Sequence, residues 1–265
     1  MVVSELYIYP IKSLRGIKVP RAFVEEKGFK FDRRWMLVDD TNEFITQRKY
    51  PTLALLQIAH VDNQFVVSTH DDGYIEIPEE INEGEEITVT VWEKKVEVLI
   101  ADNSINEWFS DTLNINCKLV YMPQNSRRLI ADDIAIKGEA VSFADEYPYL
   151  IIGQSSFDEL NARLSENITI NRFRPNIVFT GAKAHDEDSW KKFTINNIEF
   201  FGAKTCGRCV VTTINPETGE KGKEPLATLN KYRLMNNKVM FGMDAIARNI
   251  GTIAVGDRIQ ISSWK

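Results

Sequence analysis

The residues best suited to chemistry are two cysteines three positions apart, Cys206 and Cys209. Four interpretations fit this spacing. A structural zinc site needs about four ligands, and Cys117 is the only further thiol. A thioredoxin-type redox pair normally opens a helix after a strand, whereas the β-branched run from Val210 to Thr213 favours an extended continuation. The remaining two are a single thiolate that ligates a soft metal, and a pair of buried, inert thiols.

Positive charge surrounds these thiols in the sequence. Arg208 lies between the two cysteines, and Lys204 is two residues before Cys206. A nearby cation stabilises a thiolate and lowers the pKa of the thiol. We therefore expect a depressed thiol pKa in this segment.

A second group of candidates is the run Asn-Arg-Phe-Arg-Pro-Asn at positions 171–176, just before an expected strand. Pro175 favours an extended conformation for Arg174, so Arg174 and Asn176 are expected to project to the same side. Guanidinium groups bind phosphate through two parallel hydrogen bonds. Further basic sites stand at the ends of expected elements, at Lys12 with Ser13 and at Asp32 to Trp35 with Arg33.

Other common catalytic motifs are absent from the sequence. It contains no glycine-rich dinucleotide motif, no P-loop and no HExxH motif. The three histidines, His60, His70 and His185, are scattered along the chain. A metal site built from histidines is therefore not expected.

Composition narrows the class of protein. The chain has 265 residues, 43% hydrophobic and 26% charged, which is typical of a folded globular protein of one or two domains. The longest uncharged run has twelve residues, too few for a membrane-spanning helix, and the N-terminus lacks the pattern of a secretory signal. Three cysteines argue against a disulfide framework and for a reducing compartment. We expect a cytoplasmic protein without a membrane.

The net charge of −6 is unevenly distributed. From Asp71 to Asp111 there are thirteen acidic residues and two lysines, so this stretch carries −11 and the remainder of the chain carries +5. The overall sign does not favour nucleic-acid binding. The acidic stretch is typical of a solvated surface, while the basic remainder is compatible with a site for an anion.

Short apolar runs separated by turn residues predict a β-rich fold. We expect six strands in the first half and three in the second, at residues 6–9, 35–38, 44–46, 65–67, 74–77, 87–91, 176–179, 197–200 and 258–261. A further run at 117–121 opens the second half. Capping boxes at Ser104 with Glu107 and at Ser156 with Glu159 predict two helices, and a short helix is expected from Leu226 to Tyr232.

Together these segments resemble the MOSC (molybdenum cofactor sulfurase C-terminal) proteins that carry an N-terminal MOSC-N domain. The likeness extends over nearly the whole chain, and the branch it resembles is that of the bacterial YcbX-type proteins and the mitochondrial amidoxime reducing component. It rests on Tyr9 to Ser13, Asp32 to Trp35, Asn171 to Asn176, Asp188 to Trp190, Cys206 to Gly219, Lys223 to Leu226 and Gly251 to Asp257.

The resemblance implies a mixed α/β, β-rich fold: a barrel-like MOSC-N domain at residues 1–119 and a MOSC barrel with a few short helices at 120–265. It also implies a molybdenum cofactor. Cys209 would be the catalytic thiolate that ligates molybdenum, and Cys206 would not. Cofactor-binding positions would be Lys12, Ser13, Arg33, Asp145, Arg174 and Asn176, together with Cys209. The family is also associated with pyridoxal phosphate, which we do not carry over to this chain.

The implied activity is two-electron reduction of the N–O bond in N-hydroxylated compounds such as hydroxylamino bases, amidoximes and N-oxides. Some relatives carry a [2Fe–2S] domain that needs four cysteines. This chain has one unassigned thiol, so we expect a separate electron donor, a flavin reductase or an iron–sulfur or haem carrier. The acidic stretch is a candidate docking face. The alternatives are a non-catalytic carrier of the cofactor or of sulfur, a thiol oxidoreductase that uses Cys206 and Cys209, and a plain interaction module without a cofactor.

Overall fold

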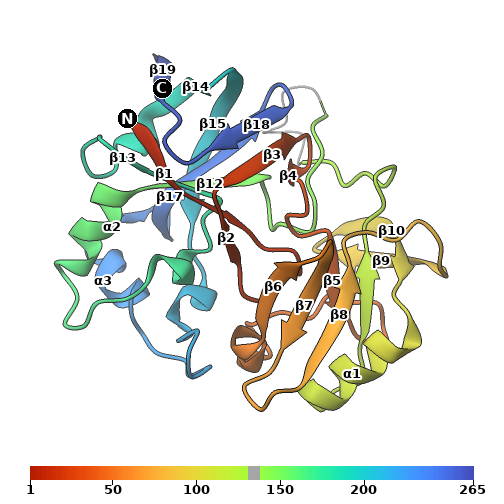
Figure 1. Cartoon of the computed structure of the whole chain (residues 1–265). Helices are drawn as coiled ribbons and strands as arrows, with labels where there is room; N and C mark the ends of the chain where they lie inside the picture. Colours follow the sequence, from red (N-terminus) through yellow and green to blue (C-terminus); the bar gives the residue numbers. More distant parts are fainter. Residues whose placement is uncertain (131–137) are drawn as a thin grey trace.

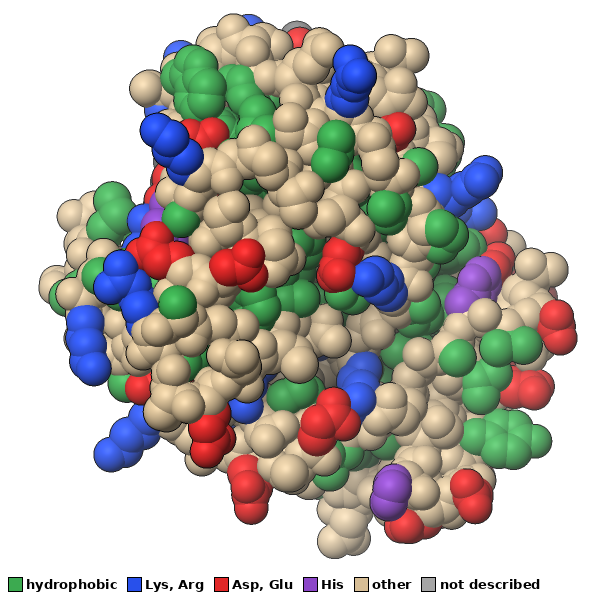
Figure 2. Space-filling model, turned by 60° about the vertical axis from the view of Figure 1, so that its left-hand side comes forward, with side chains coloured by type: hydrophobic (Ala, Val, Ile, Leu, Met, Phe, Trp, Pro, Cys, Tyr) green, Lys and Arg blue, Asp and Glu red, His purple; other side chains and the backbone are tan. Residues whose placement is uncertain are grey.

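Two β-rich lobes make up the computed structural model, which describes residues 1–130 and 138–265 (Figure 1). The expected mixed α/β, strand-rich fold is confirmed. In the described residues, no helix is both long and apolar enough to cross a membrane. Basic and acidic side chains are interspersed over the face shown in Figure 2.

The larger lobe is built on a nine-stranded sheet with the order β19-β14-β15-β17-β12-β13-β1-β2, and β16 pairs with β17. Its strands are β1 (Val2–Ile8), β2 (Ile17–Val19), β12 (Tyr149–Gly153), β13 (Ile177–Thr180), β14 (Trp190–Ile195), β15 (Ile198–Gly207), β16 (Leu234–Met235), β17 (Lys238–Ala247) and β19 (Ile259–Trp264). Aromatic and branched side chains from these strands, including Trp190 and Phe193, are fully buried in its core. The burial of this apolar surface stabilises the lobe.

The smaller lobe combines a four-stranded sheet, β5-β11-β10-β9, with a three-stranded meander, β6-β7-β8. Its elements are β5 (Trp35–Val38), η1 (Pro51–Leu55), β6 (Gln57–Val61), β7 (Gln64–Ser68), β8 (Tyr74–Pro78), β9 (Glu86–Val91), β10 (Lys94–Ile100), α1 (Asn103–Leu113) and β11 (Lys118–Tyr121). The acidic stretch of the sequence covers β8 to α1. Most strands expected here from apolar runs are confirmed, but residues 44–46 make only an isolated bridge from Phe44 to Val38.

The first part of the chain belongs to the larger lobe rather than the smaller one (Figure 1). β1 pairs with β13, so that Val2 lies opposite Thr180, and it also pairs with β2. A third sheet contains β3 (Arg21–Glu25), β4 (Gly28–Phe29) and β18 (Gly251–Ala254). The chain therefore passes from the larger lobe into the smaller lobe and back. The boundary at 119/120 stays a prediction.

The helices differ from the sequence-based expectation mainly at their starts. Besides α1 and η1, the described chain contains α2 (Gln154–Asn161), α3 (Leu226–Asn230) and the short 3₁₀ helices η2 (Ile170–Phe173), η3 (Asp186–Ser189) and η4 (Val210–Thr213). Neither predicted capping box forms. Helix α1 begins after Asp102 without a side-chain cap. Ser156 lies inside α2, where its hydroxyl donates to the Glu187 carboxylate at 2.9 Å, so a tertiary hydrogen bond takes the place of the cap.

Candidate functional site

Tyr9, directly after β1, lies at the centre of the basic residues. The guanidinium carbons of Arg33 and Arg174 each lie 4.3 Å from the centre of its ring. Its hydroxyl donates to the carbonyl oxygen of Pro175 over 3.1 Å. Burial raises the pKa of Tyr9 above its ordinary value, so the phenol stays neutral. The ring is therefore a neutral platform that holds two cations by cation–π contact.

Gly16 lies against the ring of Tyr9, where no side chain would fit. A Cβ atom added there would lie 2.4 Å from Cε1 of Tyr9. Gly16→Ala is therefore expected to lower the free energy of unfolding by about 1–3 kcal/mol, the usual cost of overpacking. Urea unfolding measures this loss. Gly222→Ala is the matched control, since the nearest atom to its added Cβ lies 3.6 Å away. Equal midpoints for the two variants would contradict the prediction.

Arg174 has a different backbone conformation from the extended one that Pro175 predicts. Its φ of 56° is left-handed, and its N–H donates to the carbonyl oxygen of Asn171 at the end of η2. Its Nη1 atom donates to the carbonyl oxygen of Leu14 over 2.6 Å, and this contact holds the turn. Asn176 follows in line with β13, and its Oδ1 atom accepts from Arg33 at 3.3 Å. The structure thus brings Arg33, Arg174 and Asn176 together through a turn.

The two arginines on Tyr9 differ in how their charge is balanced. Arg33 forms an ion pair with Asp32 at 2.6 Å. The Nη2 atom of Arg174 is buried and has no hydrogen-bond partner in the described part of the chain. Burial and the nearby Arg33 lower the pKa of Arg174 to about 10. A buried donor on an uncompensated cation favours an anionic ligand at this place.

Lys12, Asp145 and Arg48 form a second cluster beside the first. The Nζ atom of Lys12 donates to Asp145 and to the carbonyl oxygen of Phe143, both at 2.6 Å, while Arg48 donates to the other carboxylate oxygen of Asp145 at 2.8 Å. Burial lowers the pKa of Lys12 to about 8, although Asp145 opposes this. Burial also disfavours the Asp145 carboxylate, but the charges of Lys12 and Arg48 outweigh it and hold its pKa well below the usual range.

Cys209 lies at the start of η4, half-buried, with cations from two directions. The guanidinium of Arg48 interacts with its thiol from the smaller lobe, and Arg208 interacts with it from the adjacent position. The thiol of Cys209 therefore lies within the electrostatic reach of two guanidinium groups. Residues Val210–Thr213 form the single 3₁₀ turn η4, so the expected extended continuation is wrong. The turn is too short to act as the helix of a thioredoxin-type pair.

Cys206 has the opposite environment. Arg208 donates to its sulfur at 3.1 Å, but burial and the neighbouring Asp244 raise the pKa of Cys206 well above its ordinary value. The expectation of a depressed thiol pKa is therefore wrong for Cys206. Burial inside β15 outweighs the attraction of Arg208, because desolvation penalises the thiolate.

All the sequence-predicted residues except Ser13 have side chains in these contacts. Ser13 accepts a hydrogen bond from Gln47 through its carbonyl oxygen. The sequence analysis missed Arg48, which belongs to no quoted motif and reaches the site from the smaller lobe. It also missed Arg128, whose guanidinium donates to the carbonyl oxygen of Ser142 at 2.8 Å. This bond supports the segment that carries Asp145.

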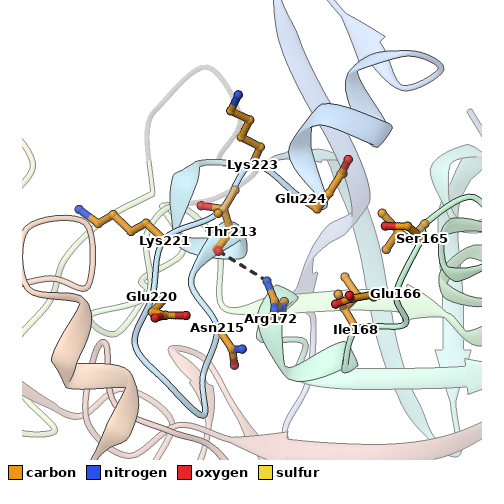
Figure 3. A pocket seen from close by; sticks show the side chains of 12 residues that line it. Ser165, Glu166, Ile168, Arg172, Thr213, Asn215, Glu220, Lys221, Lys223 and Glu224 are labelled. Atoms are coloured by element: carbon orange, nitrogen blue, oxygen red, sulfur yellow. Dashed lines mark hydrogen bonds between the residues drawn. The ribbon is translucent and has the colours of Figure 1, made fainter.

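A cavity of about 310 Å³ lies at the far end of η4, between the loop after α2 and the loop that precedes α3 (Figure 3). Basic and acidic side chains line it: Arg172, Lys221 and Lys223, with Glu166, Glu220 and Glu224. Arg172 reaches toward the carbonyl oxygen of Thr213 at 3.5 Å (Figure 3). Burial lowers the pKa of Arg172. Thr213, which lines the cavity, ends the turn that Cys209 precedes.

Comparison with known proteins identifies two domains in this chain and similar proteins that align over nearly its whole length. Residues 1–116 match the MOSC N-terminal beta barrel domain, and residues 138–260 match the MOSC domain. The mitochondrial amidoxime reducing component 2 of Bos taurus is 30% identical, covering 97% of this chain and 82% of its own length. The mitochondrial amidoxime-reducing component 1 of Mus musculus is 31% identical over an alignment that covers 98% of this chain and 82% of that protein.

A longer relative shares the same region. The molybdenum cofactor sulfurase of Oryza sativa subsp. japonica is 29% identical over 91% of this chain, which spans 32% of that protein. Two domain matches in the expected order, and relatives that align over nearly the whole chain and over 82% of their own length, establish membership. This chain belongs to the MOSC-domain family of the amidoxime reducing components.

Proposed function

We propose that this protein is a molybdenum-cofactor-dependent reductase that cleaves the N–O bond of N-hydroxylated compounds, such as hydroxylamino bases, amidoximes and N-oxides. Its relatives are named for the reduction of amidoximes, and membership of their family makes this chain an enzyme. The observation that carries the proposal is that Arg48 contacts both the thiol of Cys209 and Asp145. Asp145 in turn pairs with Lys12 and interacts with Arg174, which lies on Tyr9.

The residues present fit a molybdenum cofactor. A soft thiolate suits the metal, and Cys209 would provide it. The unpartnered Nη2 of Arg174 suits a phosphate oxygen. Lys12, Ser13, Arg33, Asp145 and Asn176 would complete the binding of the pterin and its phosphate. When bound, the cofactor supplies the two-electron redox chemistry, while the protein orients it and balances its negative charge.

Electrons would come from a separate donor protein, a flavin reductase or an iron–sulfur or haem carrier. The acidic surface from β8 to α1 of the smaller lobe is the candidate docking face for it. Three cysteines without a disulfide support a reducing, cytoplasmic location for the reaction. We expect small molecules rather than nucleic acids or membranes as the substrates.

Purification after expression with molybdate tests the proposed function. Molybdenum and pterin analysis should give about one cofactor per chain, and a hydroxylamino-purine should be reduced with an artificial electron donor. Stoichiometric molybdenum without any turnover would instead support a carrier of the cofactor or of sulfur. The likeness to the molybdenum cofactor sulfurases favours this carrier as the second candidate.

The cavity at the end of η4 is the proposed place for the part of the substrate remote from its N–O group. Arg172→Met is expected to raise the KM of an amidoxime that carries a carboxylate about tenfold, because a partly buried cation is lost. The KM of neutral benzamidoxime should change little. Lys223→Met is the matched control, since Lys223 is an exposed cation of the same cavity. A similar KM change for both substrates in Arg172→Met would contradict this assignment.

A further inference from the structure

Asp244 is a buried acid that the cofactor site does not employ. It lies within β17, opposite Lys204 of β15 and Leu150 of β12 in the sheet register. The residue is 6% exposed, and its Oδ2 atom has no hydrogen-bond partner in the described part of the chain. The buried carboxylate of Glu187 accepts hydrogen bonds from Gly153 and Ser156, and burial raises its pKa even so. An ionised carboxylate without such donors is costly in a protein interior, so the environment of Asp244 favours the protonated acid.

The groups that face Asp244 connect it to the site. The charged and titratable ones are Lys204, Cys206 and Arg208 from β15 and the loop after it, Glu146 from the segment that carries Asp145, and Lys265 at the C-terminal end. Lys204 and Glu146 form an ion pair at 2.5 Å. Burial raises the pKa of Asp244 to about 7, although Cys206, Arg208 and Lys204 oppose the shift. The group therefore exchanges its proton near neutral pH.

Arg208 is the physical link between this acid and Cys209. It donates to the sulfur of Cys206 at 3.1 Å and to the carbonyl oxygen of Phe173 at 2.6 Å. The same guanidinium interacts with Asp244 and with the thiol of Cys209. Negative charge added beside Cys209 would therefore interact with the same guanidinium that stabilises the Asp244 carboxylate, and would offset part of that stabilisation. By Coulomb's law this raises the proton affinity of Asp244.

We propose that Asp244 stores a proton for the reaction and supplies it through the thiol of Cys206 as the N–O bond is broken, while the charge of Arg208 couples the proton affinity of Asp244 to the charge at Cys209. This inference rests on the proposed function. Reduction of a hydroxylamine, R–NH–OH, consumes two electrons from the donor and two protons, breaks the N–O bond, and yields R–NH₂ and water. Asp244 provides one of these protons and solvent provides the other, after which solvent reprotonates Asp244. Asp244 contacts neither substrate nor metal and is thus a positioning residue.

The pH dependence of kcat in the molybdenum-loaded protein, with an artificial donor in excess, tests the proposal. The kcat of the unmodified protein should fall as pH rises through about 7, because the stored proton is lost. Asp244→Asn should lower kcat at pH 6 about tenfold or more, with unchanged KM, and should abolish this alkaline limb. Asp244→Glu, which retains an acid, should restore the limb. Glu199→Gln is the control, since Glu199 is an exposed carboxylate on β15, the strand that pairs with β17.

A second variant avoids any loss of folding at a buried position. Lys204 lowers the pKa of Asp244 and is half-buried at the surface, so Lys204→Gln should shift the alkaline limb to higher pH without disrupting the core. An unchanged pH profile in both Asp244→Asn and Lys204→Gln would overturn the proposal while leaving the proposed function intact.

The cofactor-free protein provides an independent measurement. Its infrared spectrum at pH 6 should contain the carbonyl stretch of a buried, protonated carboxylic acid, which disappears by pH 8 and is absent from Asp244→Asn. If the unmodified protein had no reductase activity, the proposed function would fail, and this band would still report whether Asp244 holds a proton. Absence of the band at pH 6 would overturn the proton store.

Discussion

Cys209→Ala is expected to abolish molybdenum binding and reductase activity, with activity reduced at least about a hundredfold. Cys209 is the thiol that lies beside both Arg48 and Arg208, and a soft thiolate is the ligand that we propose for the molybdenum. Elemental analysis of the purified variant and turnover of benzamidoxime with an artificial donor measure the two losses. The variant should remain folded, since the Cys209 side chain is only half-buried.

Cys206→Ala is the matched control for this prediction. Burial and Asp244 raise the pKa of Cys206, so its thiol stays protonated and is a poor ligand. This variant should retain its molybdenum, and any effect on turnover should be far smaller than that of Cys209→Ala. If Cys206→Ala abolished activity as completely as Cys209→Ala, the thiol oxidoreductase alternative would be correct.

Arg174→Met should have the second largest effect, and this effect should be on cofactor retention rather than on the stability of the fold. The cofactor-free protein holds two cations, Arg33 and Arg174, against the ring of Tyr9, and burial together with Arg33 lowers the pKa of Arg174 to about 10. Removal of one cation relieves this repulsion but also removes the hydrogen bond to Leu14 and the contact with Tyr9, so the two effects oppose each other and the free energy of unfolding of the cofactor-free protein should change little. Retention of the cofactor should fall about tenfold to a hundredfold, because a donor to its phosphate is lost.

Arg163→Met is the control for Arg174→Met. Arg163 also stacks on a tyrosine, with its guanidinium carbon 4.2 Å from the Tyr232 ring, but it forms an exposed ion pair with Glu159. Urea unfolding and molybdenum content of both variants are the measurements. A strongly destabilised Arg174→Met protein would show that Arg174 has a structural role, and full molybdenum content would show that it does not hold the cofactor.

The sequence predicts the strands well because their apolar runs are local. Trp35–Val38 forms a strand with the predicted bounds, since a run of four buried side chains between turn residues has few alternatives. Start signals for helices are less reliable. The pattern at Ser156 is a proper capping box, yet its hydroxyl bonds to Glu187, thirty-one residues further along the chain. No local pattern contains this information.

The same reasoning explains the outcome for the site. Residues in the quoted motifs, such as Lys12 and Arg174, lie close together as expected, but the partners that set their protonation come from elsewhere. Arg48 approaches Cys209 from the other lobe, and Asp244 approaches Cys206 from a neighbouring strand. A pKa depends on burial and on charges in space. The sequence therefore predicts the identity of the candidate ligands better than it predicts their electrostatics.

The return of the chain to its first lobe also has a consequence for biosynthesis. β1 emerges from the ribosome first, but its partner β13 follows only after the whole smaller lobe, and the partner of β3 lies near the C-terminus. The smaller lobe has its own core and can form while translation continues. Until β13 and β18 have been synthesised, β1 and β3 each have an unpaired edge, and unpaired edges favour aggregation. Co-translational folding of this protein should therefore begin in the middle of the chain and finish with its two ends together.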